Sequence, residues 1–88
     1  SRHLHGDAAD IKSLTTSNEE LSYLADKSEL FNTVIYYPQI NHPNVLSPHV
    51  HVDLNPANNG TLLKYDSVIN GNAVTNKYIQ IPNPLLNF

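Results

Sequence analysis

The sequence contains no cysteine and no methionine, and it has few positively charged residues and no long apolar run. Without cysteine no disulfide can form, and a chain of 88 residues buries only a small core. A bound metal ion is another common way to stabilise a domain of this size. The five Lys and Arg residues form no cluster and the net charge is −3, which argues against nucleic-acid binding. No apolar run approaches the roughly 20 residues that a membrane-spanning helix needs.

The chain opens with Ser-Arg-His, without an initiator methionine or a signal peptide. We therefore expect an N-terminally truncated fragment or a processed product of a longer protein. Its length suits one domain, and its hydrophobic fraction of 40% is not that of a disordered chain. We expect a single domain over residues 1–88.

A helix is predicted for residues 17–31. Ser17 followed three residues later by Glu20 is a capping box, which marks a helix start. The predicted buried face carries the apolar residues Leu21, Leu24 and Ala25, extended by Leu30 and Phe31.

Strands are predicted for residues 8–12, 33–37 and 49–54. The second is rich in β-branched and aromatic residues, and the third alternates strictly between polar and apolar residues. Residues 61–81 predict a hairpin, because Asn70-Gly71 between two β-prone runs is typical of a type I′ turn. The tail after residue 81 is expected to be extended and packed, or frayed.

Histidines and carboxylates are the residues most suited to chemistry. On the third strand His49, His51 and Asp53 face one side, and Val50, Val52 and Leu54 face the other. Near the amino terminus His3 and Asp10 lie seven residues apart. Two imidazoles, one carboxylate and an open position for water are typical of a catalytic zinc site, whereas a structural zinc site usually includes cysteine. Histidines two apart also occur by chance, and a single histidine is more often a surface or core residue.

The first ten residues match a known motif. Ser1, His3, Gly6, Ala8 and Asp10 fill every fixed position of the Ser-x-His-x-x-Gly-x-Ala-x-Asp motif. The chain thereby resembles the zinc D-Ala-D-Ala carboxypeptidases and dipeptidases and the related phage endolysin peptidases. His49-Val50-His51 resembles the His-x-His motif of the wider group, which includes the lysostaphin-type peptidases and the hedgehog domain. The resemblance covers residues 1 to about 55 and leaves out the C-terminal part.

The resemblance implies a role for each matching residue. His3, Asp10 and His51 would be the three zinc ligands. His49 would lie beside the zinc-bound water and act as general base or stabilise the transition state. The substrate would be a peptide of bacterial peptidoglycan, reached in the periplasm or outside the cell, in some cases by a phage-borne enzyme.

Two features depart from the family pattern. Many of these enzymes have a Glu three residues before the last ligand, where this chain has Pro48. His49, or less favourably Asp53, would have to replace that base. The family usually has a helical segment before the motif that carries a substrate-positioning Arg or Gln, and this chain starts at the motif. We therefore expect the 88-residue chain by itself to be inactive.

Other candidates have weaker interpretations. His5 occupies a variable motif position and is either solvated or close to the substrate. For Asp53 we expect a supporting hydrogen bond or a cap at the strand end. Of Tyr36 and Tyr37, one is expected in the core and the other beside the cleft. His42 lies in a proline-rich loop and is expected to be solvated.

The predicted fold is α+β, a small antiparallel sheet with one packed helix, similar to that of the hedgehog and D-Ala-D-Ala peptidase group. The helix would cover one face and Zn²⁺ the other. Residues 1–55 would form the zinc-site core and residues 56–88 an extension. The expected function is a zinc peptidase that cuts an amide bond of peptidoglycan, as a carboxypeptidase, dipeptidase or endopeptidase. The alternatives are a non-catalytic domain that binds zinc for stability and a structural virion component with a vestigial site.

Overall fold

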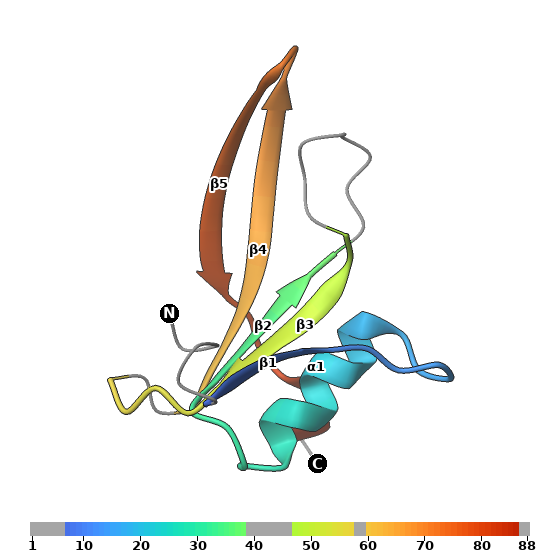
Figure 1. Cartoon of the computed structure of the whole chain (residues 1–88), viewed down its shortest axis with the longest axis vertical. Helices are drawn as coiled ribbons and strands as arrows, with labels where there is room; N and C mark the ends of the chain where they lie inside the picture. Colours follow the sequence, from blue (N-terminus) through green and yellow to red (C-terminus); the bar gives the residue numbers. More distant parts are fainter. Residues whose placement is uncertain (1–6, 39–46, 58–59, 87–88) are drawn as a thin grey trace.

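A computed structural model describes residues 7–38, 47–57 and 60–86 of the chain. Within these ranges one α-helix and five strands form a small α+β domain (Figure 1). The elements are β1 (Ala8–Ile11), α1 (Asn18–Lys27), β2 (Thr33–Tyr37), β3 (His49–Asp53), β4 (Thr61–Asn70), β5 (Ala73–Gln80) and a 3-10 turn, η2 (Pro84–Leu86). The strands predicted for residues 8–12, 33–37 and 49–54 are thereby confirmed to within one residue at each end.

The strands form one sheet in the order β1-β3-β2-β4-β5. The prediction of a purely antiparallel sheet is wrong, because β2 and β4 run parallel while the other neighbours are antiparallel. The chain leaves β3 beside the start of β2 and passes to the other side of β2 before β4 begins. Asn32 lies at this crossing: its N–H donates to the Asp53 carbonyl at 2.8 Å, and its carbonyl accepts from the Thr61 N–H at 3.1 Å.

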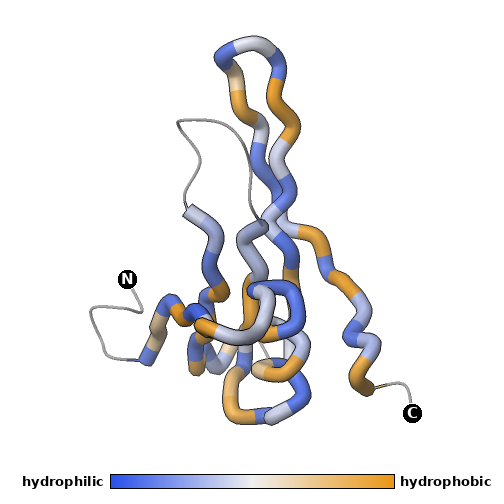
Figure 2. Tube along the Cα trace, turned by 90° about the vertical axis from the view of Figure 1, so that its right-hand side faces the viewer, coloured by the Kyte–Doolittle hydropathy of each residue, from blue (hydrophilic) through white to orange (hydrophobic). Residues whose placement is uncertain are grey.

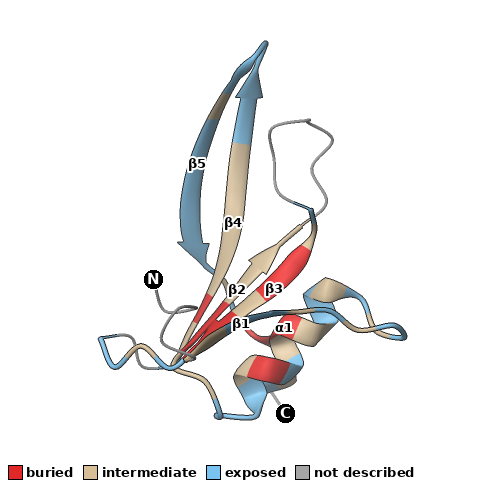
Figure 3. Cartoon of the chain, viewed as in Figure 1, coloured by how far each residue is buried: buried red, intermediate tan, exposed pale blue. Residues whose placement is uncertain are grey.

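The two faces of the sheet differ in character. The core is formed by the buried residues Ala25, Val34, Val50, Val52 and Leu62, so α1 covers the face of β3 that carries its valines. Figure 3 shows this burial at the end of the sheet next to the helix. Strand alternation places His49 and His51 on the opposite face. The predicted separation of the histidines of β3 from its valines is confirmed, whereas Zn²⁺ on the histidine face stays a prediction.

The helix begins as predicted and ends earlier. The Ser17 hydroxyl accepts a hydrogen bond from the Glu20 N–H at 3.2 Å, which caps the first turn. Because α1 ends at Lys27, Leu30 lies beyond the helical periodicity and is 69% exposed. Leu24 is also exposed, so the prediction that these two leucines belong to the buried face is wrong. Ser22 is buried instead, and its hydroxyl is satisfied by the Glu19 carbonyl at 2.6 Å.

The end of the helix contains a strained residue. Glu29 follows the C-cap with a φ of 60°, in the left-handed region that glycine adopts without a steric penalty. A residue with a Cβ is destabilised there by roughly 1–2 kcal/mol. We expect Glu29→Gly to raise the free energy of unfolding by about 1 kcal/mol, measured by urea denaturation. Glu29→Ala is the control that removes the carboxylate and keeps the Cβ. A gain of equal size in both variants would assign the effect to the charge.

The C-terminal hairpin projects beyond the other strands (Figure 1). In Figure 2 apolar and polar stretches alternate along it. The predicted hairpin is confirmed, but its two-residue loop is Gly71-Asn72, because Asn70 pairs with Ala73. Gly71 has a φ of 61° and Asn72 has no positive φ, which is typical of a type II′ turn and not of the predicted type I′.

The segment after β5 returns to the helix. Asn83 is buried, and its side-chain amide donates to the Tyr23 carbonyl at 2.9 Å and to the Asp26 carboxylate at 2.8 Å. Of the two expectations for the tail, the packed one therefore holds for the part up to Leu86, while residues 87–88 lie outside the described ranges.

Candidate functional site

Asp10 meets the two histidines of β3 across the β1–β3 pair. The antiparallel register places Asp10 directly opposite His51. The Asp10 Oδ1 atom lies 3.3 Å from His51 Nδ1 and 3.8 Å from His49 Nε2. Two of the three predicted metal ligands, Asp10 and His51, and the predicted catalytic residue, His49, are thus adjacent.

The third predicted ligand, His3, lies outside the described residues, as do His5 and His42. Within the part of the chain that the structure describes, no group of three or more His, Cys, Asp or Glu side chains is arranged to hold a metal ion. The predicted three-residue ligand set therefore stays a prediction.

The donors that are described suit a zinc ion. Two ligands at about 2.0–2.1 Å from a tetrahedral ion lie about 3.3 Å from each other. The Asp10 Oδ1 and His51 Nδ1 atoms have this separation, which a hydrogen bond between them also explains. A carboxylate oxygen and an imidazole nitrogen are also among the donors that zinc prefers. His3, from the motif, would supply the next ligand.

His51 has a carboxylate at each of its ring nitrogens. Its Nδ1 faces Asp10 at 3.3 Å, and its Nε2 lies 2.9 Å from the Asp53 Oδ2 atom. A neutral imidazole has one N–H and can donate to one of them. If the shorter contact is the hydrogen bond, the lone pair of Nδ1 lies on the side of Asp10, where it could bind a cation. A metal-bound histidine whose other nitrogen donates to a carboxylate is a recurring arrangement.

Asp53 holds the second nitrogen of His51 and also ends the strand. Its Oδ1 accepts the Asn55 N–H at 3.0 Å, so Asp53 makes both contacts that the sequence offered as alternatives. Burial acts to raise the pKa of this carboxyl, but the hydrogen bonds from Asn55 and His51 outweigh it, and the pKa lies below its usual value of 3.8. Asp53 is therefore a carboxylate at neutral pH and keeps its acceptor role toward His51.

His49 is oriented by two contacts. Its Nδ1 lies 2.7 Å from the Ser47 carbonyl, which accepts only, so this nitrogen carries the proton. Its ring stacks on Tyr37, with centroids 4.4 Å apart and an interplanar angle of 13°. The Nε2 atom, left with a lone pair in this tautomer, points toward Asp10. An unprotonated nitrogen held in this way is suited to accept a proton.

Tyr36 and Tyr37 alternate as expected, but the prediction that one of them lies in the core is wrong, because both are only partly buried. Tyr36 faces the helix side and lines a pocket of about 380 Å³ with Tyr23 and Lys64. Tyr37 faces the histidines, and two further tyrosines, Tyr65 and Tyr78, pack against it. Sequence reasoning missed these two, although period-two alternation and the hairpin register carry the signal, since Tyr65 pairs directly with Tyr78.

Burial and hydrogen bonding raise the pKa of the Tyr37 phenol above its ordinary value of 10.0, first through desolvation and then through the Tyr78 hydroxyl. The folded chain therefore keeps this proton at a pH where the unfolded chain releases it. We expect stability from Tyr37 to be fully present below pH 10 and to decrease as the pH rises above it. With no tryptophan in the chain, the phenolate absorbance reports tyrosines alone. Tyr37→Phe should remove a phenol that loses its proton only at high pH, so the phenolate absorbance of this variant should rise less at the alkaline end of the titration. The same titration curve for the variant and the parent chain would contradict this assignment.

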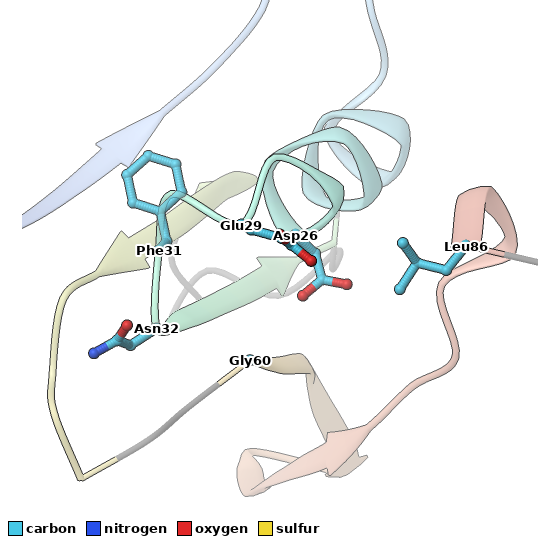
Figure 4. A pocket seen from close by; sticks show the side chains of 6 residues that line it. All are labelled: Asp26, Glu29, Phe31, Asn32, Gly60 and Leu86. Carbon is cyan, nitrogen blue, oxygen red and sulfur yellow. The ribbon is translucent and has the colours of Figure 1, made fainter.

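Three pockets among the described residues lie away from the histidines. One of about 370 Å³ is formed by Asp26, Glu29, Phe31, Asn32, Gly60 and Leu86, beside the end of α1 (Figure 4). It contains none of the residues that the sequence singled out for chemistry. The histidine site is an open part of the sheet face, where the Asp10 side chain is half exposed.

Comparison of the chain with protein-family models, with curated proteins and with solved structures finds no match. No helix among the described residues has the length and apolar character required to cross a membrane.

Proposed function

We propose that this protein is a zinc-dependent peptidase that hydrolyses an amide bond in peptidoglycan peptides, at D-Ala. The observation that carries the proposal is the position of His51 between two carboxylates. One carboxylate, Asp53, fixes the ring, and the other, Asp10, lies at the distance expected for a second ligand of the same tetrahedral ion. The motif at the amino terminus supplies the substrate class by resemblance.

Each side chain of the site has its own role in this proposal. Asp10, His51 and His3 hold the ion, which when bound lowers the pKa of a coordinated water to about 7 and polarises the scissile carbonyl. Asp53 keeps the His51 ring in place through the 2.9 Å contact. His49 accepts a proton at Nε2 and later delivers it to the leaving amine, because its Nδ1 is already committed to the Ser47 carbonyl.

The absence of the glutamate base that many related enzymes have agrees with the role given to His49. Pro48 stands where many related enzymes have a Glu base. His49 follows it directly, and its Nε2 lies 3.8 Å from Asp10 Oδ1. Asp53, the other candidate base, is engaged by Asn55 and His51 and serves better as their anchor.

The test measures metal and turnover separately. The 88-residue chain and a form extended at its amino terminus by the helical segment of the family pattern are loaded with Zn²⁺, and zinc is quantified per chain. Peptides ending in D-Ala-D-Ala are then incubated with each, and products are identified by mass spectrometry. Peptides ending in L-Ala-L-Ala are the control. We expect one zinc per chain and EDTA-sensitive cleavage of the D-peptides by the extended form. The mass of the product also distinguishes carboxypeptidase from endopeptidase action.

A non-catalytic, zinc-stabilised domain is the second candidate, favoured by the small core. Only five hydrophobic residues are buried in the described part of the chain, so a bound ion would add substantially to stability. This candidate predicts a higher melting temperature with Zn²⁺ and no turnover by either the 88-residue chain or its extended form. Absence of zinc binding would contradict both candidates.

A further inference from the structure

A continuous row of four rings crosses the face of the sheet that carries the histidines. It starts at His49 on β3 and continues through Tyr37, Tyr65 and Tyr78 on β2, β4 and β5. Successive ring centroids lie 4.4, 4.9 and 5.5 Å apart, and the Tyr37 and Tyr78 hydroxyls are 3.0 Å from each other. The row therefore connects the candidate base to the C-terminal hairpin, the part of the chain that the family resemblance leaves out.

The outer end of the row is open to a ligand. Tyr78 is 52% exposed, whereas His49 at the inner end is 9% exposed. On the same face the pair beyond Tyr65 and Tyr78 is Ser67 and Asn76, joined by a side-chain hydrogen bond of 3.0 Å. This surface presents aromatic rings, hydroxyls and a side-chain amide, so it suits a neutral chain with apolar and hydrogen-bonding groups. It does not suit a phosphate-rich ligand.

The length of the row matches a short peptide. The row bends back at Tyr65, because the Tyr37 and Tyr78 centroids lie 6.2 Å apart, so the ring of Tyr78 lies at most about 11 Å from that of His49. An extended peptide advances about 3.3–3.6 Å per residue, so the row is as long as about three residues. A dipeptide at His49 would not reach Tyr78 at the outer end.

We propose that Tyr37, Tyr65 and Tyr78 form the binding platform for the peptide that continues from the scissile bond. This rests on the proposed peptidase function. The platform selects substrates with about three residues on one side of the cleaved bond over free dipeptides. The rings contact the apolar parts of the peptide, and the Tyr78 hydroxyl, which already pairs with that of Tyr37, offers its second hydrogen-bonding position to a peptide group.

The test is a binding series that does not depend on turnover. Synthetic peptides of two, three and five residues ending in D-Ala-D-Ala are titrated into the zinc-loaded protein, with EDTA-treated protein in parallel. Tyrosine fluorescence reports binding, since the chain has no tryptophan. We expect the pentapeptide to bind about tenfold more tightly than the dipeptide. Tyr78→Ala should weaken the pentapeptide about fivefold and leave the dipeptide unchanged.

Two further variants separate binding from folding. Tyr78→Phe keeps the ring and should retain most of the pentapeptide affinity. Ile79→Ala, on the opposite face of the same strand, is the matched control and should behave as the parent protein. If Tyr78→Ala fails to fold, the peptide-length series measured on the parent protein and on Tyr78→Phe still tests whether the platform binds the longer peptide.

Equal affinity for all three peptides would overturn the proposal, as would an equal loss for dipeptide and pentapeptide in Tyr78→Ala. A glycan disaccharide without peptide that binds as tightly as the pentapeptide would assign the platform to sugar instead. Length-dependent binding without hydrolysis would leave the platform intact and contradict the proposed peptidase function. Hydrolysis without length-dependent binding would support the proposed peptidase function and contradict the platform.

Discussion

Replacement of His51 by alanine is expected to remove zinc binding and, with it, peptidase activity. His51 faces Asp10 through one nitrogen and Asp53 through the other, so no other described side chain can take over both contacts. Loss of a residue that merely supports a ligand lowers metal affinity about 10- to 100-fold, and loss of the ligand itself should exceed this. We expect zinc affinity to fall more than about 100-fold, measured by calorimetry and by metal content after dialysis.

Controls distinguish loss of the ligand from loss of the fold. His51→Gln offers an amide in place of the imidazole and should also lose zinc, while circular dichroism without metal should match that of the parent chain. Asp66→Asn, in the hairpin, removes a carboxylate that pairs with Lys77 at 3.9 Å and should bind zinc normally. If either His51 variant retained zinc near one ion per chain, the ligand set proposed here would be wrong.

Local patterns in the sequence were sufficient for the elements and for the two faces of the sheet. The strict alternation of residues 49–54 separates Val50 and Val52 from His49 and His51, and only one register buries the valines. Ser17 capped the helix as its position relative to Glu20 predicted. These features depend on neighbours within a few residues, which a sequence pattern records directly.

Features that depend on distant contacts could not be read in the same way. The parallel pairing of β2 with β4 follows from where the connection after β3 crosses, and no residue pattern in either strand records that choice. Leu24 was expected in the core, but the buried stripe of α1 is centred on Ser22 and Ala25, because the short helix meets the sheet with that side. The contact of Tyr65 and Tyr78 with Tyr37 needs the strand order as well as the hairpin register.

The candidate site shows the same division. The pairing of Asp10 with His51 requires β1 and β3 to be neighbours with one defined register, and the residue spacing alone cannot give either. The motif indicated that these residues belong together, because a shared metal ion would explain their pattern. Asp53 was recognised as a supporting residue from its place on the same strand face, and its contact with His51 is a consequence of period-two alternation.

Replacement of His49 by glutamine should separate catalysis from metal binding. His49 Nδ1 is held by the Ser47 carbonyl and its ring by Tyr37, so Nε2 is aimed at Asp10 and at whatever binds there. Glutamine retains a polar group but cannot accept and return a proton at neutral pH. Proton transfer by a positioned side chain contributes about 10²- to 10⁴-fold to a rate. We therefore expect the kcat of the form extended by the helical segment of the family pattern to fall by that factor, while zinc content and the affinity for the pentapeptide change less than about twofold.

His42→Gln is the matched control for His49→Gln, because His42 is predicted to be a solvated loop residue, and its kcat should equal that of the parent protein. Three results would contradict the role given to His49. A parallel loss of zinc would make it a ligand, and a purely higher KM would make it a substrate contact. An unchanged kcat would require another base, and Asp53→Asn would then be the next variant to measure. The proposed mechanism requires different losses at the two histidines of β3. Replacement of His51 should remove metal binding, and replacement of His49 should remove proton transfer.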